Sequence, residues 1–167
     1  MIWTNPYSCN KWWYADMQSF NIRDLVSWTS QSAGYQKRKF GAIVEVVSID
    51  VRPRFPKLDS SGFGRDHESY VVLVNTGKRK PSLKPYWPRV QVLEPRGHLS
   101  LEKGWFYIDL SGRVVQIISR KSCSSAGRTW VEYKGLIGQE QVWYTDRGTV
   151  LRGKDDCPLI LPFGSDL

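Results

Sequence analysis

The spacing of apolar residues changes once along the chain, and the change falls at Gly34. Before that residue, Ile22, Leu25 and Val26 recur at intervals of three and four, which is the period of an amphipathic helix. Asn21 directly precedes this run and suits a helix N-cap, since its side chain can accept a hydrogen bond from a free backbone N–H. Gly34 follows the run and is the residue type that most often ends a helix. The pattern therefore predicts one helix of about twelve residues that starts at Ile22.

Beyond Gly34 the chain is rich in β-branched residues and loses the helical period. Short apolar runs separated by glycine, proline, asparagine and serine are typical of β-strands joined by turns. In the first half, strands are predicted at 40–51, 68–74 and 86–95, with a long loop at 52–64.

The second half of the chain repeats this alternation of strands and turns. Because no helical runs separate the strands, small barrels or sandwiches are favoured over a parallel sheet. The predicted elements are two strands within 104–120 joined by a tight turn at Ser111–Gly112, a flexible loop at 121–127, a strand at 128–138, a hairpin at 140–153 and an apolar segment at 155–163.

Together these elements predict a mainly β protein with one N-terminal helix followed by two tandem small barrels of the SH3-like type. The expected organisation is an aromatic N-terminal segment with the helix at 1–34, a first barrel at 35–95 and a second barrel at 96–167. A chain of 167 residues is long enough for one domain or for two small ones packed together.

The net charge of +8 is unevenly distributed. Residues 1–95 carry 14 Lys and Arg against 8 Asp and Glu, whereas residues 96–167 carry 10 against 8. A basic half beside a nearly neutral half predicts an acidic partner, such as nucleic acid or an acidic protein. Simple solubility is the alternative explanation of this charge.

Other features narrow the class of protein. No apolar run is long enough to span a membrane, and the N-terminus lacks the pattern of a signal peptide, so a cytoplasmic location is expected. The cysteines Cys9, Cys123 and Cys157 are too widely spaced for a predicted zinc site and are expected to be free thiols. The glycines match no phosphate-binding loop motif.

Two basic segments, 36–40 and 77–89, hold most of the positive charge of the first half. The second segment interleaves its cations with aromatic rings, which is the arrangement that single-stranded nucleic acid requires for phosphate contact and base stacking. The alternative is a solvated loop in which the rings belong to the core. The predicted partner or nucleic-acid contacts are Lys37, Arg38, Lys39, Lys78, Arg79, Lys80, Lys84, Tyr86, Trp87 and Arg89.

The stretch "RDHES" at 65–69 invites an enzymatic interpretation, because a histidine stands beside acidic residues. A metal-dependent hydrolase centred on His67 would need His98 to approach through the fold, since no second histidine lies at metal-binding spacing. The simpler interpretation is pairing among charged residues at the mouth of a strand. Possible rim contacts are Arg65, Asp66, His67, Glu68, Trp12 and Trp13.

The segments "KFGAIVEVV", "RDHESYVVLV" and "YWPRVQVLEP" resemble small accessory β-module proteins of bacterial phages and mobile elements. The segments "GWFYIDLSGRVVQII", "VWYTDRGTVL" and "DCPLILPF" are similar to the same class. The resemblance implies a bacterial host and, since several such proteins antagonise host defences, an inhibitor of the anti-CRISPR kind. It assigns no catalytic residue, metal or cofactor. The expectation is a non-enzymatic binding protein that engages nucleic acid or a host nucleoprotein or defence complex. A nucleotide sponge that uses a cleft between the barrels is a further alternative.

Overall fold

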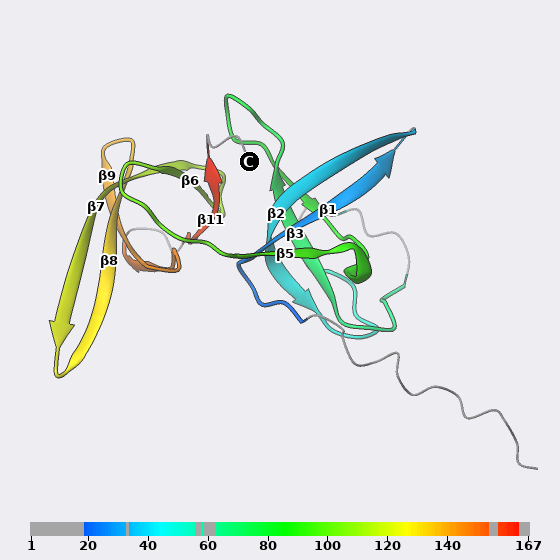
Figure 1. Cartoon of the computed structure of the whole chain (residues 1–167), viewed down its shortest axis with the longest axis horizontal. Coiled ribbons are helices and arrows are strands. Elements are labelled where there is room, and N and C mark those ends of the chain that lie inside the picture. The colour runs from blue at the N-terminus through cyan, green and yellow to red at the C-terminus, as the bar shows by residue number, and fades with distance from the viewer. Residues whose placement is uncertain (1–18, 33, 56–57, 59–62, 154–156, 164–167) are drawn as a thin grey trace, which may run out of the picture.

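The computed structural model describes residues 19–32, 34–55, 58, 63–153 and 157–163. These residues form two antiparallel β-sheets, one of five strands and one of six, which lie beside each other along the longest axis of the molecule (Figure 1). One of the sheets curves into a half-barrel. The prediction of a mainly β protein is therefore confirmed.

The first sheet has the order β4-β3-β2-β1-β5. Its last strand returns across the sheet to pair with its first strand, and a single 3-10 turn, Val90–Val92, precedes that last strand. The strands are β1 (Asp24–Ser32), β2 (Tyr35–Val47), β3 (Ser69–Asn75), β4 (Leu83–Tyr86) and β5 (Glu94–His98). The predicted domain boundary at residue 95 falls inside β5 and stays a prediction.

The predicted N-terminal helix is wrong, because the segment that suggested it forms β1. Val26 and Trp28 are buried in the core on one face of the sheet, whereas Leu25 is buried on the other face. A helix would place Leu25 and Val26 on one side. In the structure the segment is a strand between β2 and β5, and a different buried cluster covers each of its two faces. Burial on two faces by distant strands therefore overrides the local helical spacing.

The second sheet repeats the topology of the first, since its last strand pairs with its first strand in the order β10-β9-β8-β7-β6-β11. The loop predicted at 121–127 is wrong, because β7 continues to Ser125 and turns at Ala126–Gly127 with positive φ at both residues. The strands are β6 (Phe106–Asp109), β7 (Val114–Ser125), β8 (Arg128–Ile137), β9 (Glu140–Thr145), β10 (Val150–Arg152) and β11 (Leu159–Phe163).

The buried apolar side chains form three clusters. One cluster lies on the first sheet around Trp28 and Tyr70, and a second lies on the second sheet around Tyr107 and Tyr144. The third joins the two sheets, and its buried members are Leu25, Ala42, Leu73, Ile108, Ile160 and Leu161. Because these side chains come from both sheets, the sheets pack against each other instead of being linked only by the chain.

Tyr144 makes the second core sensitive to alkaline pH. Its side chain is fully buried, its hydroxyl has no hydrogen-bond partner among the described residues, and burial raises its pKa to about 12. Above a pH of about 10 the unfolded chain ionises this phenol while the folded state keeps it neutral. The stabilising contribution is therefore complete below pH 10 and is lost as the pH rises toward 12, by about 1.4 kcal/mol per pH unit.

We expect Tyr144→Phe to remove this component of the pH dependence in urea denaturation followed between neutral pH and a pH of about 11. At neutral pH the substitution leaves the free energy of unfolding unchanged or raises it by about 1 kcal/mol, because the phenylalanine buries no unpaired hydroxyl. Tyr35→Phe is the matched control, since that ring is 80% exposed. Equal alkaline loss of stability in the wild type and Tyr144→Phe would contradict this account.

Candidate functional site

The basic run of the first half lies within β2, where alternation separates its members. Lys39 pairs in register with Trp28, and it lies on the face that carries the first core cluster. Lys37 is two residues away and shares that face, whereas Arg38 points to the opposite face. The cations that are consecutive in sequence therefore belong to two different surfaces.

Lys39 and Lys84 meet over the ring of Tyr86. The Lys39 ammonium lies 3.8 Å from the ring centroid and the Lys84 ammonium 5.7 Å from it, both within the range of a cation–π contact. The ring is half-buried and packs edge-on against Trp28 at a centroid distance of 5.8 Å. Together Lys37, Lys39, Lys84 and Tyr86 form what we call the lysine–tyrosine face, because they share one side of β2 and β4.

The loop between β3 and β4 carries three more cations, Lys78, Arg79 and Lys80, all exposed. Among the described residues, none of these side chains has a hydrogen-bond or ion-pair partner. The Asn75 side chain holds the loop, because its amide donates to the Gly77 carbonyl and its oxygen accepts from the backbone N–H groups of Gly77 and Ser82. The hydrogen bonds of Asn75 thus hold the loop in one conformation, and its three positive charges face the solvent.

Arg38 does not contribute to that charge in the same way. Its guanidinium donates to the Glu94 carboxylate at 2.9 Å, and Arg96 reaches the same carboxylate oxygen at 3.1 Å. Ser27 connects the group, since its hydroxyl lies within hydrogen-bond distance of all three side chains. The pairs are well exposed and contribute little to stability, so this network chiefly lowers the local positive charge.

Trp87 and Arg65 hold the chain after β4 in place. The Arg65 guanidinium stacks on the Trp87 ring at 4.2 Å and donates to the backbone carbonyls of Trp87 and Pro88. The indole N–H donates to the Ser69 hydroxyl at 3.0 Å. Burial, together with the charge of Arg89, lowers the pKa of Arg65. These contacts leave Arg89 as the exposed cation of this segment.

The histidines of the enzymatic alternative belong to separate contacts. His67 Nδ1 lies 2.7 Å from the exposed Asp66 carboxylate, whereas His98 Nδ1 lies 2.7 Å from Asp24. Glu68 accepts a hydrogen bond from the Tyr70 hydroxyl at 2.6 Å. Burial of the Tyr70 side chain raises its pKa, and the hydrogen bond to Glu68 is the second cause. Within the described ranges, no group of three or more His, Cys, Asp or Glu is placed to hold a metal ion.

Trp12 and Trp13, predicted as possible rim contacts, lie outside the described residues. The same holds for Cys9, whereas Cys123 and Cys157 are free thiols. In the part of the chain that the structure covers, no helix has the length and apolar character needed to cross a membrane.

The β7–β8 hairpin is a basic element that the sequence interpretation did not select. It projects from the second sheet at the end of the molecule opposite the β1–β2 hairpin (Figure 1). Arg120, Lys121 and Arg128 are exposed on it, and Trp130 is 42% exposed. The local charge composition of the sequence could have identified this hairpin, because residues 110–131 contain no acidic residue.

No protein-family model matches this chain, and no match is found among curated proteins or solved structures. Its class is therefore defined by what the molecule shows, namely two packed antiparallel sheets with basic, partly aromatic surfaces.

Proposed function

We propose that the protein is a non-enzymatic binding protein that engages nucleic acid, alone or within a host nucleoprotein complex. The observation that carries this proposal is the pair of lysine ammonium groups over the half-buried Tyr86 ring, on a sheet whose β3–β4 loop adds Lys78, Arg79 and Lys80. Ammonium groups bind phosphates and release counterions, and the Tyr86 ring holds two of them at one place on the sheet.

We further propose that the two sheets are SH3-like barrels in tandem. Strand order supports this, because in both sheets a meander of antiparallel strands is completed by a last strand that returns to the first. In the first sheet the short 3-10 turn before β5 also fits that architecture. Such barrels serve many functions, so the fold alone does not select a partner.

The proposed setting is the cytoplasm of a bacterial host, where a phage or mobile element would supply the protein as an inhibitor of a defence system. The resemblance to phage accessory modules and the net charge of +8 support this proposal. The mechanism would be occlusion of a nucleic acid or nucleoprotein surface, without turnover, because charge contact alone accounts for the binding.

Reversal of the charge on the β3–β4 loop tests this function. We expect K78E/R79E/K80E to weaken binding of a fluorescent single-stranded oligonucleotide at least tenfold, since three phosphate contacts are replaced by repulsion. The slope of log affinity against log salt should fall by about 2, measured by anisotropy between roughly 50 and 200 mM salt. The loop is exposed, so the variant should keep the thermal stability of the wild type.

The matched control is R120E/K121E/R128E, which makes the same charge change on the β7–β8 hairpin. We expect it to retain most of the binding. Equal losses in both triple variants would show that net charge decides the affinity, and unchanged binding by K78E/R79E/K80E would remove the proposed surface altogether. A pull-down from bacterial lysate with and without nuclease then separates free nucleic acid from a nucleoprotein complex.

A further inference from the structure

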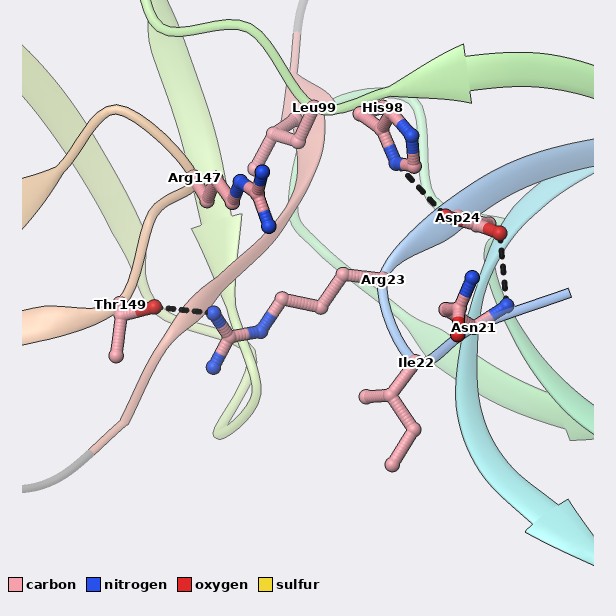
Figure 2. Close-up of a pocket in the computed structure, with 8 residues that line it drawn as sticks. All are labelled: Asn21, Ile22, Arg23, Asp24, His98, Leu99, Arg147 and Thr149. Atoms are coloured by element: carbon pink, nitrogen blue, oxygen red, sulfur yellow. Dashed lines mark hydrogen bonds and ion pairs between the residues drawn. The ribbon is translucent and has the colours of Figure 1, made fainter.

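A pocket of about 660 Å³ opens where the two sheets meet (Figure 2). This volume lies within the range of small-molecule sites in proteins. Its walls come from the start of β1, the end of β5 and the turn between β9 and β10, which are distant in sequence. The lining residues are Asn21, Ile22, Arg23, Asp24, His98, Leu99, Arg147 and Thr149.

Arg23 spans this pocket from the first sheet to the second. Its side chain donates a hydrogen bond to the Thr149 hydroxyl, 126 residues away in the chain. Its backbone has φ of +77°, a left-handed conformation that costs free energy for a residue with a long side chain, while its N–H donates to the Ile43 carbonyl at 2.7 Å. The fold thus holds Arg23 in a strained conformation that directs its guanidinium across the opening.

Arg147 approaches the same opening from the second sheet (Figure 2). It lies on the exposed β9–β10 turn, and its guanidinium has no hydrogen-bond or ion-pair partner within the described part of the chain. Two arginines from two sheets therefore share one cavity. Both guanidinium groups can donate hydrogen bonds to the oxygens of an anion that enters the cavity.

Among the described residues that line the pocket, only Asp24 has a carboxylate, and this carboxylate is already engaged. Asp24 accepts a hydrogen bond from the Asn21 backbone N–H at 2.7 Å and lies 2.7 Å from His98 Nδ1. These contacts hold the Asp24 carboxylate beside the Asn21 backbone and the His98 ring. The pocket also offers guanidinium donors, the groups that bind phosphate oxygens most specifically.

The pocket lining also includes aliphatic side chains. Ile22 is 58% exposed although it is a large aliphatic residue, and Leu99 lines the pocket on the other side of the Arg23 side chain, near Arg147 (Figure 2). Aliphatic side chains together with guanidinium groups suit a ligand with an anionic and a flat apolar part. A nucleotide combines these two parts in a molecule that fits the volume.

We propose that this pocket binds a small nucleotide, with its phosphates between Arg23 and Arg147 and its base against the aliphatic side chains of the lining. The site is distinct from the lysine–tyrosine face, because it lies between the sheets and shares no residue with that face. A ligand held by both arginines would bridge the two sheets and stabilise their packing, since it binds only when both are folded and in contact.

The test is calorimetric titration and thermal denaturation of the full chain with adenine and guanine mononucleotides and cyclic dinucleotides. We expect at least one probe to raise the melting temperature and bind with Kd below about 100 μM, whereas the matching nucleoside and inorganic phosphate bind at least tenfold more weakly. R147Q should weaken the nucleotide tenfold or more, while R128Q, an exposed arginine on the β7–β8 hairpin, should not.

Three outcomes would overturn the proposal. They are no binding of any nucleotide up to about 1 mM, binding that R147Q leaves unchanged, or loss in R147Q of oligonucleotide binding alone. This proposal can fail separately from the nucleic-acid function, because K78E/R79E/K80E should leave nucleotide binding intact and R147Q should leave oligonucleotide binding intact. R147Q changes an exposed turn residue, so the variant should fold and each result remains interpretable.

Discussion

Replacing Asp109 with alanine is expected to lower the free energy of unfolding by about 3 to 5 kcal/mol, because it removes a fully buried carboxylate that accepts several hydrogen bonds. The Asp109 side chain is fully buried at the β6–β7 turn. It accepts hydrogen bonds from the backbone N–H groups of Ser111 and Arg113, from the Ser111 hydroxyl and, at 2.7 Å, from Arg113 Nε. Alanine leaves these donors without their acceptor. Urea denaturation followed by tryptophan fluorescence measures the loss.

The matched control is Asp146→Ala in the turn between β9 and β10. Asp146 is an exposed aspartate in another hairpin turn, so its removal should change the free energy of unfolding by less than about 0.5 kcal/mol. Asp109→Asn should fall between the two, because it keeps an acceptor oxygen for the turn but loses the charge that faces Arg113. Similar stability of Asp109→Ala and the control would show that the turn forms without this carboxylate.

The second large effect is expected for Gly41→Ala in the middle of β2, with a loss of about 3 kcal/mol or more. A Cβ at this position would lie 2.3 Å from the backbone oxygen of Leu73 and 2.7 Å from a methyl group of Val72. The Leu73 oxygen cannot move without separating β2 from β3. The substitution therefore weakens the pairing of the two strands, because no change of side-chain rotamer can relieve the clash.

Gly127→Ala is the comparison that isolates this close approach. Gly127 has a positive φ but has nothing within 4 Å of the added methyl group, so its cost comes only from the backbone and should be about 1 kcal/mol. Denaturant melts of both variants, with intact circular dichroism in the control, check the difference. If Gly41→Ala were no less stable than Gly127→Ala, the contact between β2 and β3 would be looser than the structure shows.

Most strands could be predicted from sequence because their pattern depends on neighbouring residues. β3 and β8 lie within one residue of the predicted runs at 68–74 and 128–138, and the turn at Ser111–Gly112 divides β6 from β7 as expected. The basic segment 36–40 precedes the strand predicted at 40–51, but it lies inside β2. Its charged residues are tolerated there because the first residues of β2 are exposed and extend beyond the buried part of the sheet.

The candidate site was only partly accessible from sequence. Residue types identified Lys39, Lys84 and Tyr86, but not that Tyr86 would receive both ammonium groups. Trp87 satisfied the same aromatic criterion, yet its ring is stacked under Arg65 and its indole N–H is bonded to Ser69. The difference between these two adjacent rings depends on which strand face each occupies, which composition does not report.

By itself, the sequence determined the β character of the chain beyond Gly34, the turn at Ser111–Gly112 and the excess of positive charge in its first half. These properties follow from residues close together in the chain, through strand propensity, turn preference and charge. Only the tertiary structure decided that Leu25 and Val26 belong to a strand, because β2 and β5 cover the two edges of β1 and separate cores cover its faces. It also brought Arg23 and Arg147 into one pocket, since the packing of two sheets joins residues that no local pattern relates.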